Sequence, residues 1–416
     1  MALIREKSCE CFKSELDIFS VKPTQTSILE HHTIGYKPVS SLADNAPTEF
    51  VIPGHGDDYM DLAHTMLNID ARIVKANGQL LLPTDKTIGP VNDFLNAMFS
   101  EVQIYLNNKL ISFPSHMHPY RSYFEKALNY DISAKSSHLQ SALWYKDTAG
   151  AFDNVSEDNK GFTKRNQLTK QSKTFDMFGY LHSDIFNQEK FLINGVEMRI
   201  KLIPSKNTFC LMGLDDSEGK VEILDATLYV RKVSVSSSIK LSHNRILQKH
   251  TAKYPLTRVQ LKAVTIPKDI VSKTIDNVIL GRLPKRLVVG FVTNDAFNGT
   301  LSTNPFNFQH FNYNFFTLYV DGVQIPGKPL QPDFENNKYI TAYHTLFSEQ
   351  GYALLVFDIT PDAAASAISH CSLQRQGAVS LEVHFKSALE STVTCVIYSE
   401  FDALMEINNQ RDIHLD

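Results

Sequence analysis

The residues best suited to chemistry lie in one short stretch, where His55 is followed by Asp57, Asp58 and Asp61. An imidazole beside three carboxylates can hold a metal ion or serve general acid–base catalysis. The stretch reads Pro-Gly-His-Gly-Asp-Asp-Tyr-Met-Asp, and its proline and glycines are typical of a turn between strands. Short patterns of this kind arise often by chance, so we favour a turn whose carboxylates face water.

Two other pairs of potential ligands are weaker candidates. His116 and His118 would share one face of a strand, but prolines flank them and predict a loop. Cys9 and Cys11 lack the second pair of ligands that a zinc site needs. The chain also has no Gly-x-Ser-x-Gly, Gly-Lys-Ser/Thr or His-Glu-x-x-His motif. We predict no catalytic residue, no metal ligand and no cofactor, and we do not expect an enzyme.

Composition narrows the remaining classes. The chain has 416 residues and a mass of 47.0 kDa, with 43% hydrophobic and 21% charged residues, which is ordinary for globular domains. Its net charge of −4 argues against a protein that binds nucleic acid by itself. Five cysteines predict no disulfide framework. No apolar run is long enough for a transmembrane helix, and early charges exclude a signal-peptide core, so we expect synthesis inside a cell.

Most segments alternate apolar and polar residues with a period of two, clearest at 67–73, 198–202, 259–263 and 381–385. Successive side chains of a strand point to opposite faces, so this pattern predicts antiparallel sheets with one buried and one wetter face. Predicted turns separate the strands at Pro53-Gly54, Asn77-Gly78, Asn194-Gly195, Asp321-Gly322 and Pro326-Gly327.

Helical patterns are fewer. Helices are expected at 12–19, 120–129 and 239–250, each short enough to belong to a connection between strands. The sequence therefore predicts an all-β protein with short helices in its connections.

The two halves of the chain resemble each other. Residues 102–111 and 316–325 both predict a strand, a two-residue turn and a second strand, and they pair Tyr105 with Tyr319 at an offset of 214. Asn107-Asn108 and Asp321-Gly322 suit the positive φ angles of a hairpin turn.

Three further pairs follow in the same order. They are Tyr123 with Tyr343, Asp184 with Asp358, and Val196 with Val379, at offsets of 220, 174 and 183. One insertion in the first half, at about 131–176, explains the change of offset, and we interpret the pattern as a duplication.

The duplication predicts two tandem eight-stranded jelly rolls, since each half has about the length that such a fold needs. We expect an N-terminal arm at 1–24, a first jelly roll at 25–238 and a second at 239–416.

Several motifs are similar to those of the major capsid proteins of Polinton/Maverick elements and adintoviruses. They lie at residues 14–28, 52–62, 88–95, 143–150, 191–198, 251–256, 281–285, 304–308 and 329–334. The resemblance implies a double jelly-roll major capsid protein that forms a homotrimeric, pseudo-hexagonal capsomer. Such capsomers would tile an icosahedral shell around double-stranded DNA, with penton and minor or cement proteins as partners and the virion as location. The resemblance implies no catalytic residue and no sequence-specific contact with nucleic acid.

Subunit contacts are expected to be rich in aromatic residues. In the arm, Phe12, Leu16 and Phe19 are candidates either for docking on a neighbouring subunit or for packing on their own domain. Trp144, the only tryptophan, makes the insertion a candidate for inter-subunit or outward-facing structure.

The aromatic cluster around Phe306, Phe308 and Phe311 is a further candidate contact, although the core of the second jelly roll is the favoured interpretation. Two other functions stay open: a carbohydrate-binding or hydrolytic double jelly roll, and a domesticated capsid-derived protein. The first would need a carboxylate pair beside exposed aromatic residues, which the sequence does not show.

Overall fold

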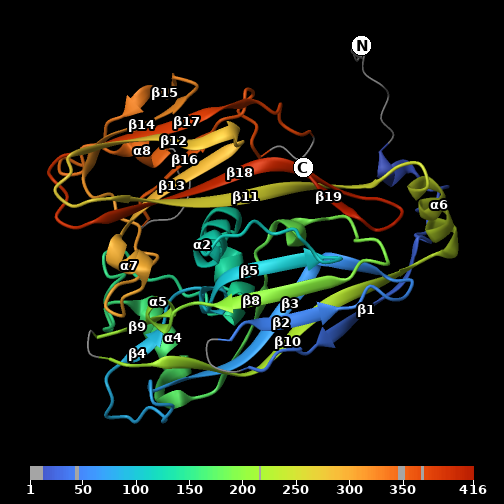
Figure 1. The fold of residues 1–416 in the computed structure, drawn as a ribbon, viewed down its shortest axis with the longest axis horizontal. Coiled ribbons are helices and arrows are strands. Elements are labelled where there is room, and N and C mark those ends of the chain that lie inside the picture. The colour runs from blue at the N-terminus through green and yellow to red at the C-terminus, as the bar shows by residue number, and fades with distance from the viewer. Residues whose placement is uncertain (1–12, 43–45, 215–216, 345–351, 367–369) are drawn as a thin grey trace.

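Strands dominate the chain, and they form two lobes stacked on each other (Figure 1). The computed structural model describes residues 13–42, 46–214, 217–344, 352–366 and 370–416. All the pairings between neighbouring strands of the two lobes are antiparallel, as the period-two alternation predicts.

The first lobe contains two four-stranded sheets. One has the order β1 (Ile28–Tyr36), β10 (Lys220–Val235), β3 (Tyr59–Val74) and β7 (Phe175–Tyr180). The other has the order β2 (Thr48–Ile52), β8 (Met198–Pro204), β5 (Phe99–Leu106) and β6 (Lys109–Leu110). A small extra pair joins β4 (Ile88–Pro90) to β9 (Leu211–Gly213).

The second lobe repeats this arrangement. One sheet has the order β11 (Ala252–Ile266), β18 (Val393–Ile407), β13 (Arg286–Thr293) and β16 (Leu354–Asp358), with β19 (Ile413–Leu415) added on β18. The other has the order β12 (Ser272–Arg282), β17 (Gln376–Phe385), β14 (Tyr313–Val320) and β15 (Val323–Leu330). Strand for strand, the order along the chain matches the first lobe, which supports the duplication.

The matching hairpins agree residue by residue. Tyr105 pairs with Leu110 in the first lobe, and Tyr319 pairs with Gln324 in the second. The turn residues of both hairpins have positive φ angles, from 45° to 78°, as predicted for Asn107-Asn108 and Asp321-Gly322.

One predicted pair is displaced by two residues. Leu106 lies opposite Met198, and its counterpart Val320 lies opposite Val379. Val379 therefore corresponds to Met198 and not to Val196. A shift of two residues keeps every side chain on the same face, so the sequence pattern does not reveal it.

The connections hold the helices. The first lobe has α1 (Phe94–Ala97), α2 (His118–Asn129), α3 (Ile132–Lys135), η2 (His138–Ala142), α4 (Lys160–Thr169), η3 (Lys170–Ser172), η4 (Asp184–Asn187) and α5 (Asn207–Cys210). Along the chain, α6 (Ser237–Leu247) connects the first lobe to the second. The second lobe has α7 (Asn294–Asn298) and α8 (Ile340–His344). The predictions for 120–129 and 239–250 are confirmed as α2 and α6.

Two local predictions are wrong. Within the described part of 12–19, only a 3-10 turn forms, η1 (Ser14–Leu16), because these side chains have no surface of their own chain to pack on. Pro326-Gly327 lies inside β15 instead of a turn. This strand is at the edge of its sheet, where a residue without an N–H is tolerated.

Candidate functional site

The two lobes share a buried interface, which we call the interlobe interface. It lies between α2, with the segments around it, and the sheet of β11, β18, β13 and β16 (Figure 1). On β13, Val288 and Val292 belong to the hydrophobic cluster that continues into the first lobe. Their neighbours Val289 and Phe291 point the other way, into the core of the second lobe. This sheet is therefore covered on both faces, which joins the lobes into one block.

Aromatic rings fill the centre of the interlobe interface. The rings of Tyr123 and Phe306 stack with centroids 4.0 Å apart and planes inclined by 8°. Phe124 lies 5.0 Å from Phe308 and 5.8 Å from Tyr398 on β18, again between centroids. Residues of the first lobe, contributed by α2, thus pack directly on residues of the second.

Most of the aromatic residues predicted to contact other subunits are buried within the monomer. Phe306, Phe308 and Trp144 are buried, and Trp144 packs on Tyr123 with centroids 5.0 Å apart. These three side chains have no surface left for a neighbouring chain, so the predicted subunit contact does not hold for them. Phe306 and Phe308 also lie at the interlobe interface and not in the core of the second lobe. Phe311 is partly buried against that core.

The insertion is also bound into the structure. Arg165 on α4 forms a buried ion pair with Asp147, with Nη2 2.6 Å from Oδ1. The other oxygen of Asp147 accepts a hydrogen bond of 2.9 Å from Asn304 of the second lobe. Asn304 further donates its backbone N–H to Asp153 at 2.7 Å. The insertion therefore joins the lobes through buried contacts, and the prediction that it faces outward is wrong for these residues.

A buried ionic network lies next to the aromatic rings. Arg121 on α2 contacts Glu125 through Nε at 2.8 Å and Asp184 through Nη2 at 2.7 Å. His182 Nδ1 lies 2.6 Å from the second oxygen of Glu125. Asp184 also accepts the backbone N–H of Val259 on β11 at 3.1 Å, which ties the network to the second lobe. Removing one partner of such a network strongly destabilises the fold, because the other charge stays buried without its partner.

The network shifts its carboxyl groups in opposite directions. Burial raises the pKa of Glu125, but the positive charges of Arg121 and His182 outweigh burial and lower this pKa to about 2. For Asp184, burial is the larger effect, and it raises the pKa despite Arg121 and the hydrogen bond from Val259.

The residues considered for chemistry do not form a site. His55 is exposed in the connection between β2 and β3, as the turn prediction expects. Asp57 lies 3.4 Å from Lys240, and Asp61 lies 2.7 Å from His64. Within the described ranges, no three His, Cys, Asp or Glu residues come close enough to hold a metal ion.

The two histidines predicted in a loop have separate environments. His116 is exposed and its Nδ1 lies 3.0 Å from Glu101, whereas His118 begins α2 and is buried. Burial, then the charges of His182 and Arg121, lower the pKa of His118 well below its ordinary value. Cys9 and Cys11 lie outside the described residues. The described part of the chain contains no helix that is both long and apolar enough to cross a membrane.

The N-terminal arm is the most exposed apolar segment. Leu16 is 63% and Phe19 is 95% exposed, so neither packs on its own domain, while Phe12 lies outside the described residues. Of the two interpretations of the arm, docking on a neighbouring subunit is the one that stays open.

Solved structures share the architecture described above. A protein in the structure of the Sputnik virophage matches with a TM-score of 0.65 and 11% identity, over 100% of this chain and 94% of its own. The chain has the double jelly-roll fold. The Faustovirus major capsid protein matches with a TM-score of 0.60 and 8% identity, over 96% of this chain and 92% of its own. The mavirus major capsid protein matches with a TM-score of 0.54 and 13% identity, over 100% and 95%.

Sequence comparison finds a full-length relative of unknown role. The uncharacterized protein F54H12.2 of Caenorhabditis elegans is 24% identical over 94% of this chain and 99% of its own length. No family model matches the chain. The narrower resemblance to Polinton and adintovirus proteins stays a prediction, because the three solved structures named above come from Sputnik, Faustovirus and mavirus.

The interlobe interface was not among the predictions from the sequence. The sequence does contain a pattern that indicates this interface. β13 and the first half of β18 are runs of nearly continuous apolar residues, without the alternation seen elsewhere. Such runs are typical of strands buried on both faces.

Proposed function

We propose that this protein is a major capsid protein whose function is to assemble. The observation that carries the proposal is the pair of lobes with one strand order, held together by a buried interface into a single two-lobed block. Solved double jelly rolls from Faustovirus and mavirus, which are named major capsid proteins, have the same fold over nearly the whole chain. No catalytic role is proposed.

Three copies of the block would form the capsomer. Each copy contributes two lobes of similar shape, so threefold association gives six lobes and a pseudo-hexagonal outline. Such an outline can tile an icosahedral shell, here around double-stranded DNA, with penton and minor or cement proteins completing it. The net charge of −4 fits a shell that encloses its genome without binding the phosphates through clustered positive charge. The virion is the proposed location, and 25–238 and 239–416 are the proposed jelly-roll units.

The oligomeric state of the purified chain tests this proposal. A trimer has three times the mass of 47.0 kDa, which is about 141 kDa, and multi-angle light scattering measures this directly. A permanent interface buries more than roughly 2,000 Å², so the trimer should persist at micromolar concentration. A chain that stays monomeric there would contradict the proposal. Cryo-electron microscopy of the same sample would show whether six lobes surround one threefold axis.

The nematode relative favours a second candidate, a capsid-derived protein that an animal genome has retained for another role. It matches over the full length, so both lobes are present in a chain from an animal. This candidate keeps the trimer but not the shell. Particles in expressing cells support the viral role, whereas stable trimers that never form particles support the retained copy.

A further inference from the structure

The arm exposes apolar side chains in close succession. The structure describes the predicted arm from residue 13 onward, and we use the word arm from here on for the whole described segment before β1, residues 13–27. The exposed fractions are 63% for Leu16, 75% for Ile18, 95% for Phe19 and 92% for Val21. Isolated exposed apolar residues are common, but a contiguous set marks a surface that another molecule covers.

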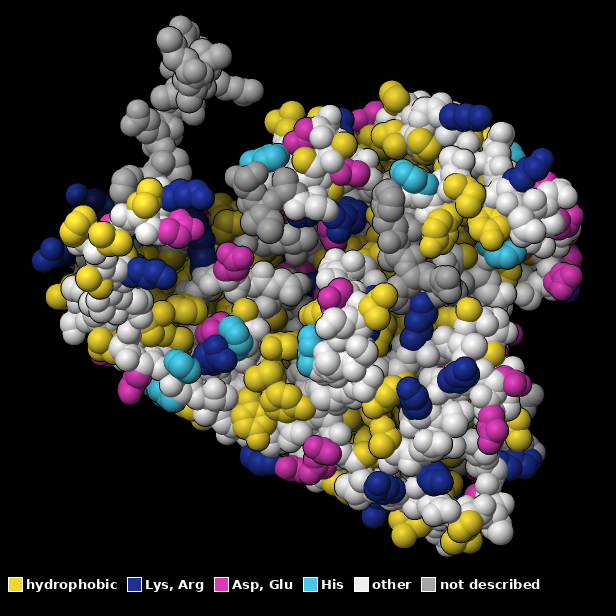
Figure 2. Space-filling model, turned by 180° about the vertical axis from the view of Figure 1, so that it is seen from behind, with side chains coloured by type: hydrophobic (Ala, Val, Ile, Leu, Met, Phe, Trp, Pro, Cys, Tyr) yellow, Lys and Arg dark blue, Asp and Glu magenta, His cyan; other side chains and the backbone are white. Residues whose placement is uncertain are grey.

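An apolar groove lies where the arm joins the body. It has a volume of about 470 Å³ and runs beside α6, between the starts of β1 and β11. Its apolar lining comes from Ile28, Phe191, Ile193, Ile239, Ile246 and Leu247. Figure 2 shows hydrophobic and basic side chains intermixed at this end of the molecule, which is on the left in that view.

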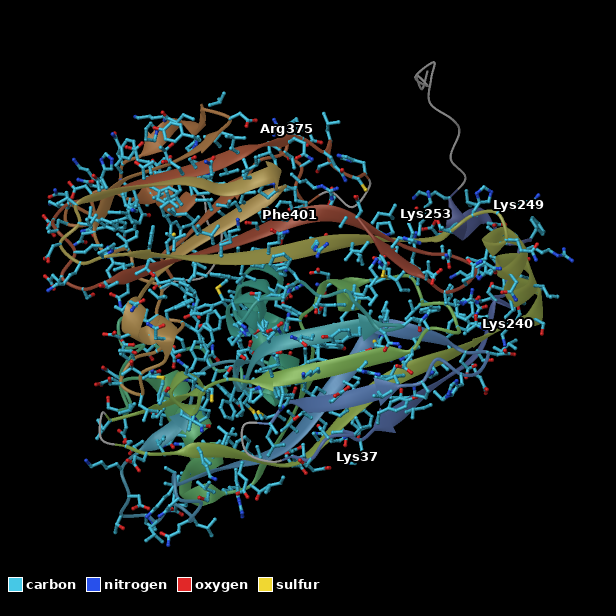
Figure 3. The ribbon with its side chains drawn as sticks, viewed as in Figure 1. Lys37, Lys240, Lys249, Lys253, Arg375 and Phe401 are labelled. Atoms are coloured by element: carbon cyan, nitrogen blue, oxygen red, sulfur yellow. The ribbon has the colours of Figure 1, made fainter. Side chains whose placement is uncertain are left out.

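The rim of the groove is basic, and the part of the arm around Leu16 is acidic, while Lys13 and Lys22 make the arm neutral as a whole. Lys190 and Lys253 line the groove, and Lys240 and Lys249 lie at the same end of the molecule (Figure 3). Lys253 contacts Glu406 at 3.5 Å, but its side chain remains 62% exposed. In the arm, Glu15 and Asp17 flank Leu16, so an arm placed in the groove would bring two carboxylates to a basic rim.

The arm leaves its own groove instead of filling it. Ser27 is part of the groove lining, yet residues 13–26 are all exposed. An extended segment spans up to about 3.3–3.6 Å per residue, so the eight residue-to-residue steps from Ser27 to Phe19 reach roughly 26–29 Å beyond the groove. A segment of that length extends well clear of its own lobe, as binding to a copy beside this end of the molecule requires.

We propose that the arm of one copy binds in the α6 groove of a second copy, with Ile18, Phe19 and Val21 covering the apolar lining and Glu15 and Asp17 facing the lysines. This interaction rests on the proposed assembly function and specifies which surfaces join the copies. It explains why the arm does not fold on its own lobe.

Cysteine cross-linking between differently tagged copies tests the contact. The background is the full chain with Cys9→Ser, Cys11→Ser and Cys371→Ser, which leaves only the buried Cys210 and Cys395. One tag carries Phe19→Cys and the other carries Ile246→Cys; both positions are exposed, so the substitutions should not disturb folding. The two chains are co-expressed and oxidised mildly with diamide.

We expect a reducible species that carries both tags. A matched control replaces Ile246→Cys by Leu280→Cys, an exposed position on β12 of the second lobe, and should give at least several-fold less product. Adding Glu15→Lys and Asp17→Lys to the arm should lower the yield again, because the charges would then repel.

Three outcomes separate this proposal from the capsomer proposal. Trimers without a cross-link would overturn the arm contact and leave the capsomer intact. Monomers without a cross-link would overturn both. A single chain that carries both Phe19→Cys and Ile246→Cys tests whether the arm binds the groove of its own chain. A disulfide within that chain, with none between the two tags, would refute binding to a second copy.

Discussion

Phe306→Ala should destabilise the monomer itself, because this side chain belongs to the interlobe interface. Phe306 is completely buried and stacks on Tyr123 at 4.0 Å, with Tyr120 and Phe209 at its edges. Replacing a buried phenylalanine by alanine costs about 3–5 kcal/mol in lost transfer free energy and cavity formation. For a lobe of roughly 200 residues, each kcal/mol of lost unfolding free energy lowers the melting temperature by roughly 2–4 °C. We therefore expect the melting temperature to fall by roughly 10 °C.

Urea unfolding followed by tyrosine and tryptophan fluorescence measures this loss, because Tyr123 and Trp144 report on the same cluster. Phe19→Ala is the matched control: the same substitution at a 95% exposed side chain should change the unfolding free energy of the monomer by less than about 0.5 kcal/mol. If Phe306→Ala instead left the unfolding free energy unchanged and only raised the dissociation constant of the trimer, Phe306 would be a subunit contact and our assignment would be refuted.

Glu125→Gln should cost about 3–5 kcal/mol in urea unfolding at pH 7, because it leaves the buried Arg121 with one carboxylate fewer. The pKa of Glu125 is lowered from 4.5 to about 2, so its stabilisation is present above pH 4.5 and is lost as the pH falls through 2. The difference between wild type and Glu125→Gln should therefore shrink over that range; a constant difference would contradict the ionic network. Gly161→Ala should destabilise by roughly 1–3 kcal/mol, since its Cβ would lie 2.3 Å from the carbonyl oxygen of Lys146. Gly327→Ala, where a Cβ meets open space, is its control in thermal unfolding, and equal melting temperatures would refute the predicted clash.

The repeated fold was largely predictable because it depends on local patterns. The alternation of apolar and polar residues specifies which strands have one wet face, and the turn pairs Asn107-Asn108 and Asp321-Gly322 specify two hairpins with the same register. Both features are encoded over a few neighbouring residues. The two-residue error at Val196 arose for the same reason, since a period of two cannot distinguish a register from one displaced by two residues.

The interlobe interface was harder to predict because its partners are far apart in the sequence. Phe306 meets Tyr123 across 183 positions, and Asn304 meets Asp147 across 157. An aromatic cluster looks the same in the sequence whether it covers a core, an interlobe interface or another subunit. The insertion shows the same difficulty: it was a candidate for inter-subunit or outward-facing structure, yet Arg165 and Asp147 form a buried ion pair.

The pairing of the first strand of each lobe with the last affects how the chain matures on the ribosome. Ile28 of β1 has no pairing partner until Val235 of β10 has been synthesised. Ala252 of β11 likewise has none until Ile407 of β18 has been synthesised. At translation rates of about 5–20 residues per second, β1 lacks its partner for roughly 10–40 seconds while the intervening 207 positions are made. During that time its polar backbone is open to pairing with other nascent chains. Slower synthesis or high expression should therefore favour aggregation of the first lobe, and holdase chaperones should protect it.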